Sequence, residues 1–445
     1  DRRLWTLMAD VPTMTGEAHR QAMKSFDQLW VWDDPAIAES LGWYLDVAEN
    51  RMPAKFRIAR TIAVALSVEQ ATEEALWEEL DRLTPAFLHR LEGIRDHGDP
   101  LGPATPGRNL LDLCRELTRR MLTHCNFCRW DCQVDRSKGT KFGTCKLASD
   151  TRVSTYFHHP GEELVYRGVR GSGTIFFTSC NMRCAFCQNG DISTDKDNGV
   201  VVDARTLATM AWLLRMEGCH NVNWVGGEVT IHLHTIVEAI HLLGSDFARP
   251  SREDIVNSLP VKADYFTAFT IAPEEGTYDG EFNAPMLWNS NFFMSDEAMR
   301  ILRILIDVWL PDVKFGPGRC AISLARTPRY WETVTGNLAL IHGWREDLTI
   351  RHLVMPAHVA CCTYPVLDWI AENMPDVPVN IMDQYHPDNF CDPTSKNYQS
   401  RYQEIARSPT RDEVRDALRY ADGLGLNFET ITNEKNRMGL RLQSA

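Results

Sequence analysis

The chain has 445 residues, 44% of them hydrophobic and 24% charged, so it can bury a substantial core and fold as about two or three domains. Lysine and arginine total 47 against 60 acidic residues, and this net charge of −13 argues against a broad basic surface for nucleic acid. No apolar run approaches the ~18 residues of a membrane-spanning helix, and the first residues lack the pattern of a secretion signal. Thirteen cysteines, seven of them in two tight groups, indicate metal or cluster binding in a reducing compartment, so we expect a cytoplasmic protein.

The N-terminal part reads as helical. Apolar residues recur at steps of three and four in Ala54–Leu66, Thr72–Leu83 and Asn109–Leu122. Glycine and proline punctuate residues 98–107 and indicate a joint there. We therefore predict three parts: a helical N-terminal domain at 1–108, a cysteine-rich connecting segment at 109–165 and a β/α barrel at 166–435.

The first group of cysteines lies in the connecting segment, with the spacing C-x2-C-x3-C-x12-C. Its members, called the upstream cysteines below, are Cys125, Cys128, Cys132 and Cys145. Four thiolates can hold an auxiliary 4Fe-4S cluster, or they can hold zinc tetrahedrally. The compact spacing of the first three favours the cluster, and zinc stays open as the alternative.

From Gly171 onward, short apolar runs alternate with helical patterns, which is typical of a parallel sheet in a partial or full β/α barrel. Asp203 is a candidate N-cap for a helix that runs to about Gly218, and a second helix is expected at Ile231–Leu243. Residues 245–285 interrupt this rhythm as an insertion, either a lid or a surface excursion. The predicted strands are Thr174–Thr178, Val222–Val225, Met286–Asn289, Val308–Lys314, Thr349–Met355, Val377–Met382 and Leu426–Thr432.

The second group of cysteines directly follows the first predicted strand of the barrel. Cys180, Cys184 and Cys187 form a C-x3-C-x2-C triplet with Phe186 before the last thiol. Three thiolates on one loop can hold three irons of a 4Fe-4S cluster and leave the fourth iron open to a small chelating molecule. Buried apolar thiols or a zinc knuckle fit less well, because zinc sites usually have four ligands. Ligands gather at the carboxyl ends of parallel strands, so this loop predicts a reactive cluster at the barrel mouth.

Polar residues follow the later strands at the same expected rim. Gly226 and Gly227 let the backbone approach a ligand closely, and Glu228 can accept hydrogen bonds from an ammonium group. Each polar group alone is also consistent with an ordinary hydrogen-bonded strand end, so their repeated placement is the stronger argument. The other candidates are Asn289 and Asn291 for ribose hydroxyls, Lys314 for a carboxylate, and Arg351, Asp383 and Gln384 at the fifth and sixth strands.

The cysteine triplet and the Gly-Gly-Glu element resemble the radical S-adenosylmethionine (SAM) superfamily. As a set, the motifs from about 125 to 432 resemble its PflX-like branch, which is related to pyruvate formate-lyase activating enzymes. The chain departs from that pattern at Ser179, where relatives commonly carry glycine, and at Arg129, where they usually carry proline. The further motifs that carry the resemblance are Gly171–Phe177, Asn223–Gly227, Trp288–Asn291, Leu310–Phe315, Arg351–Pro356 and Val379–Tyr385.

The resemblance implies an oxidoreductase or activase-like enzyme in which SAM chelates the open iron of the cluster. Reductive cleavage of SAM then gives a 5′-deoxyadenosyl radical that abstracts a hydrogen atom. We expect a protein or peptide substrate, recognised by the N-terminal region, and a reductant of the flavodoxin or ferredoxin type. The alternatives are a radical SAM enzyme that acts on a small metabolite or lipid, and a non-catalytic iron-sulfur electron carrier.

The remaining cysteines give weaker signals. Cys361 and Cys362, with His358 nearby, are interpreted as an incidental thiol pair in a loop, with a metal or redox site as the alternative. Cys320 and Cys391 could give a hydrogen atom to a radical, but no neighbouring residue in the sequence supports that role.

Overall fold

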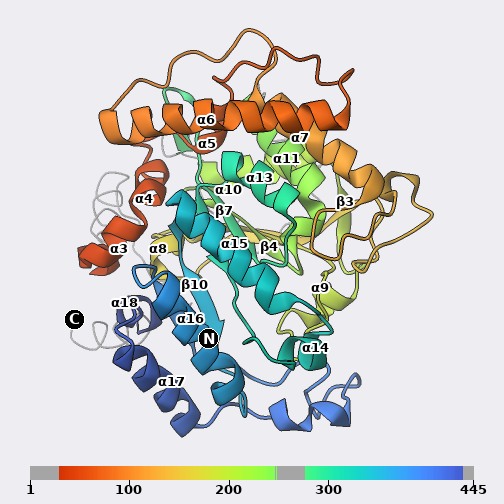
Figure 1. Cartoon of the computed structure of the whole chain (residues 1–445), viewed down its shortest axis with the longest axis vertical. Coiled ribbons are helices and arrows are strands. Elements are labelled where there is room, and N and C mark those ends of the chain that lie inside the picture. The colour runs from red at the N-terminus through yellow and green to blue at the C-terminus, as the bar shows by residue number, and fades with distance from the viewer. Residues whose placement is uncertain (1–29, 246, 248–275, 434–445) are drawn as a thin grey trace, which may run out of the picture.

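The computed structural model describes residues 30–245, 247 and 276–433, and helices surround its central sheet. In Figure 1 the long helix α6 (Glu73–His97) lies across one end of the molecule and α17 (Arg411–Gly423) lies at the other. The other α-helices are α3 (Pro35–Ser40), α4 (Gly42–Ala48), α5 (Lys55–Ala59), α7 (Leu110–Met121), α8 (Leu164–Arg167), α9 (Gly190–Thr194), α10 (Ala204–Met216), α11 (Leu233–Gly244), α13 (Asp296–Leu305), α14 (Cys320–Ala325), α15 (Tyr330–Trp344), α16 (Tyr364–Asn373) and α18 (Glu429–Thr432). Short 3-10 segments cover Trp30–Asp33, Leu122–His124, Arg136–Lys138, Val229–His232 and Ser400–Ile405, and a π-helical segment, η7, covers Val359–Thr363.

The strands form a mixed but mainly parallel sheet. Seven of them pair in the order β3-β1-β2-β4-β7-β8-β9, and β10 pairs with β11. All pairs from β2 to β9 are parallel, and a parallel bridge between Asp312 and Arg351 continues the series to β10. This confirms a mixed α/β fold with a central parallel-rich sheet, as in a partial barrel. The strands are β1 (Thr151–His159), β2 (Ser172–Phe177), β3 (Val200–Val202), β4 (Val222–Gly226), β5 (Thr277–Tyr278), β6 (Glu281–Phe282), β7 (Met286–Ser290), β8 (Val308–Pro311), β9 (Asp347–Leu348), β10 (Ile350–Leu353) and β11 (Val379–Met382).

The parallel strands are buried because helices cover the outside of the sheet. Trp224, Trp288 and Trp309, on three neighbouring strands, have no solvent exposure. Every residue of β7 and of β8 is buried. Burial along the whole strand is typical of parallel strands with both faces covered. Asp203 accepts a hydrogen bond from the Thr206 amide at 2.7 Å and caps α10, as the sequence predicted.

One predicted strand is wrong, and five observed strands were not predicted. Residues 426–432 were expected to be a strand, but they form an irregular segment with a bend at Asn427, followed by the short helix α18. The buried side chains of Phe428 and Ile431 lie three residues apart, which is a helical spacing, and the Asn427 carbonyl accepts a single hydrogen bond from the Val379 amide. Of the unpredicted strands, β1 and β3 extend the sheet in the antiparallel direction beyond β2, and β5, β6 and β9 have only two residues each.

The predicted insertion at 245–285 lies mainly outside the described residues. Its described end contains a short antiparallel pair, β5 with β6. This pair lies next to the N-terminal helices, since the rings of Phe56 and Phe282 are 6.2 Å apart.

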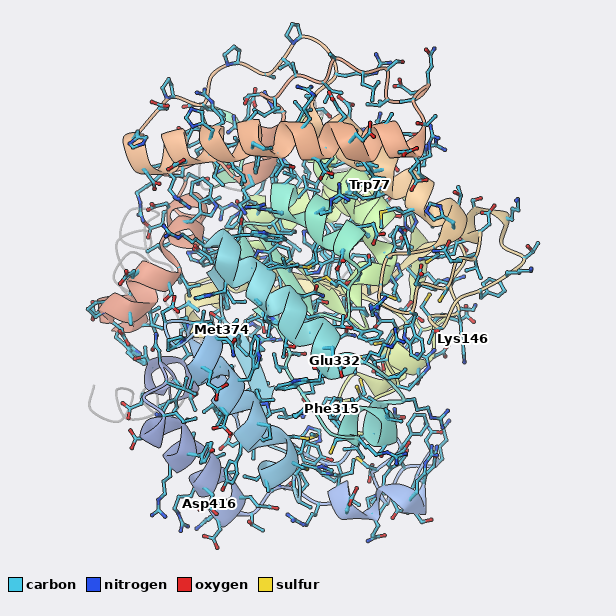
Figure 2. The ribbon with its side chains drawn as sticks, in the orientation of Figure 1. Trp77, Lys146, Phe315, Glu332, Met374 and Asp416 are labelled. Atoms are coloured by element: carbon cyan, nitrogen blue, oxygen red, sulfur yellow. The ribbon has the colours of Figure 1, made fainter. Side chains whose placement is uncertain are left out.

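The N-terminal helices pack onto the barrel through a large shared apolar core and a smaller cluster that joins α3 and α4 to β7 and β8. Their polar anchors lie at the amino-terminal ends of β8 and β9: Asp307 accepts from the Lys55 amide at 3.0 Å, and Asp347 accepts from the Tyr44 amide at 2.7 Å. Figure 2 shows Trp77 beneath α6, where the guanidinium of Arg300 from α13 stacks at 4.5 Å from its ring centroid. The expected helices at Thr72–Leu83 and Asn109–Leu122 are confirmed, with α6 extending to His97, whereas α5 ends earlier than predicted, at Ala59. Among the described helices, none is both long enough and apolar enough to cross a membrane.

Candidate active site

The cysteine triplet lies on the loop between β2 and α9, at the carboxyl end of the first parallel strand. The amides of Arg183 and Ala185 donate to the carbonyls of Ala325 and Leu324 at 3.1 and 2.7 Å, so the end of α14 holds this loop in place. Phe186 packs between Phe315 and Tyr385, with ring centroids 5.9 and 5.7 Å away. Figure 2 shows Phe315 inside the molecule beside α14. These contacts hold the cysteine loop against α14, Phe315 and Tyr385.

The three thiols lie within electrostatic reach of one another. Burial raises the pKa of Cys180 well above the ordinary value, and the charges of Glu228, Cys184 and Cys187 raise it further. Burial also raises the pKa of Cys184 to about 12, against the lowering effect of the Lys314 ammonium. Buried thiols with raised pKa values are protonated at neutral pH, and binding to a metal ion or cluster holds them as thiolates.

Gly226 and Gly227 permit a close approach between the end of β4 and the residues that precede Cys180. A Cβ on Gly227 would lie 1.8 Å from the Ser179 carbonyl oxygen, and one on Gly226 would lie 2.2 Å from the Phe177 amide nitrogen. The Gly227 amide donates to the Phe177 carbonyl at 2.8 Å. The sequence analysis assigned the glycines to close contact with a ligand, whereas the structure places them against the cysteine loop itself.

Glu228 connects the ends of β4 and β7. Its Oε1 accepts hydrogen bonds from the Thr230 amide and hydroxyl at 2.9 and 2.5 Å and from the Ser290 hydroxyl at 2.8 Å. Its Oε2 accepts one hydrogen bond, from the Asn291 amide at 3.0 Å. The carboxylate is 2% exposed, and Oε2 keeps acceptor capacity because a carboxylate offers about four lone-pair positions.

Asn291, directly after β7, faces the cysteine loop, and Asn289, within β7, faces the barrel interior. The Asn291 side-chain amide donates to Cys180 Sγ at 3.7 Å and to Asn181 Oδ1 at 2.8 Å. Asn289 Nδ2 donates to Glu162 Oε2 at 3.4 Å inside the barrel. The structure thus brings Asn291 to Cys180, the first thiol of the triplet, whereas Asn289 lies further inside the barrel, beside Glu162.

Lys314 lies at the end of β8, next to the triplet. Its ammonium group pairs with Asp312 at 2.8 Å, and the charges of Asp312, Tyr330 and Cys184 raise its pKa despite burial. Its backbone amide donates to the Tyr330 hydroxyl at 2.9 Å. The arrangement keeps a permanent cation beside Cys184.

Arg351 lies inside the barrel. Its partners, Glu162 and Glu163, were not predicted from the sequence. Its guanidinium pairs with Glu162 at 2.6 Å and with Glu163 at 2.5 Å, and it contacts Asn289 Oδ1 at 3.5 Å. Asn380 on β11 also donates to Glu163, at 2.7 Å. The Arg351 cation outweighs burial and lowers the pKa of Glu163 to about 2. The adjacent glutamates before α8 were the available sequence signal, but they precede the predicted strands and carried no recognisable motif.

Asp383 and Gln384 lie at the end of β11 with their side chains exposed. The Gln384 carbonyl accepts a hydrogen bond from Gln188 Nε2 at 3.2 Å. Gln188 directly follows Cys187, the last cysteine of the triplet. The segment that follows β11 therefore contacts the end of the cysteine loop.

A buried arginine lies beside Cys125, the first of the upstream cysteines. Burial raises the pKa of Cys125 and of Cys128, and the charge of Cys145 raises both further. Arg136 is fully buried, and its Nη1 lies 3.9 Å from Cys125 Sγ. Its Nη2 has no hydrogen-bond partner among the described residues. Cys132 is less buried, with its Sγ 4.0 Å from Thr144 Oγ1.

The two cysteine groups are directly connected. The Ser179 hydroxyl donates to the Cys145 carbonyl at 2.5 Å, and Ser179 has a positive φ of 67°. Glycine adopts such a φ without strain, whereas serine at this position adds the hydrogen bond to Cys145. Arg183 also donates to the Thr144 carbonyl at 2.6 Å, and Trp130 Nε1 donates to the Asn181 carbonyl at 2.7 Å.

Both groups suit iron-sulfur clusters chemically. Cys180 Sγ accepts from the Met182 amide at 3.3 Å, in addition to Asn291, and Cys187 Sγ lies 3.2 Å from the Ser193 hydroxyl. Hydrogen bonds to sulfur are a normal feature of iron-sulfur ligation. At the upstream cysteines, a thiolate-bound metal centre would supply the negative charge that the buried Arg136 needs.

Comparison with known proteins agrees with this geometry. The model of the radical SAM superfamily matches residues 174–273, which contain the triplet and Glu228. The uncharacterized protein MJ0674 of Methanocaldococcus jannaschii is 32% identical over 395 residues, which cover 87% of this chain and 98% of that protein. The chain belongs to the radical SAM superfamily. Membership in this superfamily implies an enzyme with a 4Fe-4S cluster and bound SAM, and the residues at the rim fit both.

Among solved structures, this radical SAM protein is similar to SuiB of Streptococcus suis bound to SAM, at 12% identity and a TM-score of 0.36, over 56% of this chain and 48% of SuiB. SuiB bound to its precursor peptide SuiA aligns over 80% of this chain and 62% of SuiB at the same TM-score. The structure of anSMEcpe with bound AdoMet has 14% identity and a TM-score of 0.33, over 57% and 59% of the two chains. The chain thus spans about half to three fifths of these proteins.

Proposed function

We propose that the protein cleaves SAM reductively at a 4Fe-4S cluster held by Cys180, Cys184 and Cys187. When bound, the cluster and SAM supply a 5′-deoxyadenosyl radical for hydrogen abstraction. The observation that carries the proposal is the convergence of three strand ends on one thiol group: Asn291 contacts Cys180 directly, and Glu228 bonds to the Asn291 amide. An electron carrier has no need for this polar rim.

We assign each part of SAM to different side chains of the rim. Glu228 would hold the SAM amino group through Oε2, and Gly226 and Gly227 would keep Glu228 close to the cysteine loop. Lys314 would neutralise the SAM carboxylate beside Cys184. Asn289, Asp383 and Gln384 would contact the adenosyl part. Asn291 fixes the Cys180 thiol, and Arg351 with its two glutamates supports the barrel interior.

We place an auxiliary 4Fe-4S cluster at the upstream cysteines. The burial of Arg136 beside Cys125 supports an anionic centre there. A zinc ion needs sulfur atoms about 3.8 Å apart. Among the described residues, a group of ligand atoms within 4.8 Å of one another occurs around Cys320 and not here, which favours the larger cluster. Iron, sulfide and zinc contents of a Cys125→Ser/Cys128→Ser variant test the assignment, since loss of zinc without sulfide would contradict it.

For the substrate we propose a protein or peptide, as in the PflX-like branch, with residues 1–108 as the recognition region and a flavodoxin or ferredoxin as reductant. The motif set at 171–385 supports this assignment. The second candidate is a small polar metabolite, which the buried charges of Arg351, Glu162 and Glu163 inside the barrel favour over a lipid.

The decisive experiment is anaerobic reconstitution with iron and sulfide, reduction with dithionite, addition of SAM and detection of 5′-deoxyadenosine. Wild type should form the product, and Cys184→Ala should abolish it. Cys114→Ala is the matched control, because this thiol is buried on α7 and lies in neither cysteine group. An intact cluster that yields no product would favour the electron carrier.

A further inference from the structure

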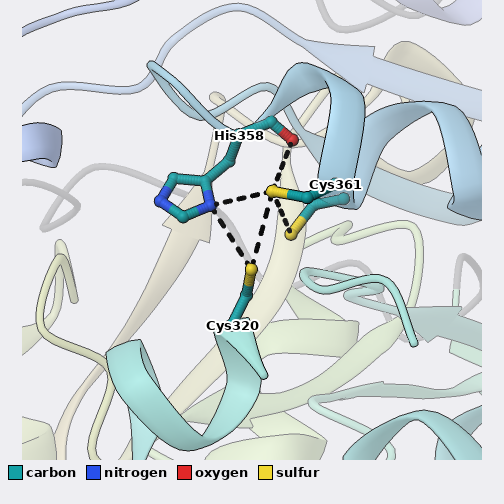
Figure 3. A group of neighbouring side chains, drawn as sticks. Cys320, His358 and Cys361 are labelled. Atoms are coloured by element: carbon teal, nitrogen blue, oxygen red, sulfur yellow. Dashed lines mark hydrogen bonds between the residues drawn. The ribbon is translucent and has the colours of Figure 1, made fainter. Parts of the chain in front are cut away.

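A third group of sulfur and nitrogen ligands lies outside both cysteine groups. It consists of Cys320, the first residue of α14, with His358, Cys361 and Cys362 on and before the π-helical segment η7 after β10. Figure 3 shows three of these side chains pointing at one another from two separate segments. Their ligand atoms all lie within 4.8 Å of one another. The fold thus brings Cys320 to residues about forty positions later in the chain.

The distances match the edges of a tetrahedron around a single metal ion. Cys320 Sγ lies 3.6 Å from Cys361 Sγ and 3.5 Å from His358 Nδ1, which is 3.3 Å from Cys361 Sγ. Cys361 Sγ and Cys362 Sγ are 4.0 Å apart. With metal–sulfur bonds of about 2.3 Å and metal–nitrogen bonds of about 2.0 Å, tetrahedral zinc requires ligand separations of about 3.5 to 3.8 Å. A 4Fe-4S cluster needs wider spacing, because each sulfur binds a different iron.

The donor set and its surroundings also favour zinc. Three thiolates and one imidazole form a common structural zinc site, and soft sulfur ligands select zinc over magnesium or calcium. Cys362 is 1% exposed and His358 is 7% exposed, so two of the ligands are shielded from water. Glu404 Oε1 lies 3.6 Å from His358 Nε2, on the far side of the ring from the sulfurs. A carboxylate behind a metal-binding histidine orients the ring in many metal sites.

A disulfide explains the geometry less well. The two shortest sulfur separations, 3.6 and 4.0 Å, exceed a sulfur–sulfur bond of about 2.05 Å. Pairing two of the thiols would also leave the third thiol and the histidine without a common purpose.

We propose that Cys320, His358, Cys361 and Cys362 bind one structural zinc ion that ties α14 to the segment after β10. The location gives the ion a defined task. The carbonyls of Leu324 and Ala325, at the other end of the short helix α14, hold the cysteine triplet loop. Gly316, in the loop before α14, lies so close to η7 that a Cβ there would be 2.4 Å from the Cys361 carbonyl oxygen. Zinc therefore fixes the support of the triplet loop, and the proposal does not depend on the radical chemistry.

The test measures zinc, iron and acid-labile sulfide in the full chain purified without added zinc. We expect about one zinc per chain in wild type and in Cys125→Ser/Cys128→Ser, and its loss in Cys320→Ser/Cys361→Ser. Cys391→Ser is the matched control and should retain zinc, because this thiol bonds to the Asp388 carbonyl instead. Zinc that stays in the Cys320→Ser/Cys361→Ser variant, or that is lost with the upstream cysteines, would overturn the proposal.

A second measurement uses folded wild type and so does not depend on the stability of a variant. Replacement of zinc by cobalt(II) should give intense thiolate charge-transfer bands and tetrahedral d–d bands, at about one cobalt per chain. Absence of these bands, a disulfide found by thiol counting, or one non-sulfide iron in place of zinc would each contradict the assignment.

Discussion

At the scale of single residues, close contacts between backbones shape the site. Gly227 and Ser179 lie against each other where β4 meets the chain before Cys180, and the Ser179 hydroxyl reaches Cys145 at the upstream cysteines. Gly227, through its lack of a side chain, and Ser179, through its hydroxyl group, thus hold the two cysteine groups in place. Glu228 adds a buried carboxylate that joins two strand ends.

Gly227→Ala should prevent assembly of the triplet cluster. The new Cβ would lie 1.8 Å from the Ser179 carbonyl oxygen, so the residues before Cys180 must move. Reconstituted protein should contain about four fewer irons per chain than wild type, measured with sulfide by chemical analysis. Gly343→Ala, in α15 with open space around its Cα, is the control and should keep its iron. A soluble Gly227→Ala protein with full iron content would show that the close approach is not required.

At the scale of elements, helices hold the cysteine groups from outside the barrel. Helix α7 begins with a capping box between Asn109 and Asp112 and leads through a 3-10 turn into Cys125. The His241 ring of α11 also lies 2.8 Å from Asp112, which ties α7 to the barrel. Helix α14 holds the triplet loop in a comparable way, through its last two carbonyls.

Asn109→Ala should loosen the start of α7 and, with it, the upstream cysteines. Loss of an N-cap costs about 1 kcal/mol of unfolding free energy. We expect a lower thermal midpoint and faster release of metal from the upstream site to a chelator. Thr410→Ala removes a similar capping box from α17, so it should lower the midpoint but leave metal release unchanged. Equal release rates in the two variants would argue that α7 does not support the site.

At the scale of the whole molecule, two acidic side chains join the N-terminal helices to the barrel. Asp307 and Asp347 accept amide hydrogen bonds from α5 and α4, and burial raises their pKa to about 6 and about 8. A raised carboxyl pKa means that the folded chain binds the proton more tightly than the unfolded chain, whose Asp titrates near about 3.9. The resulting stability is present at low pH and is lost as the pH rises through the folded value. Buried His220 and His232, with pKa values lowered to about 3, act oppositely, and their contribution is lost below about pH 6.5.

Asp347→Asn should therefore flatten the pH dependence of stability between pH 7 and about 8.5. Wild type should lose stability over this range as Asp347 ionises, whereas asparagine still accepts the Tyr44 amide and carries no charge. The difference should be on the order of 1 kcal/mol, discounted because Asp347 is partly exposed. Thermal midpoints of both proteins, measured at the two pH values, check the prediction. An equal change of thermal midpoint with pH in wild type and in Asp347→Asn would contradict the prediction.

The sequence by itself determined the local features of this protein. The spacing of Cys180, Cys184 and Cys187, their place after a strand, and the cap at Asp203 follow from neighbouring residues, because turns and caps are built from a few consecutive positions. The alternation of apolar runs and helices likewise predicted the parallel-rich sheet. Residues 426–432 show the limit of this reasoning, since their composition fitted a strand and their packing against β11 made a helix.

Only the tertiary structure decided which distant side chains meet. It paired Arg351 with Glu162 and Glu163, joined Ser179 to Cys145, and brought Cys320 to His358 and Cys361. These contacts depend on strand register and on how loops cross at the barrel rim. Local patterns do not encode either property, because both are set by the packing of the whole core.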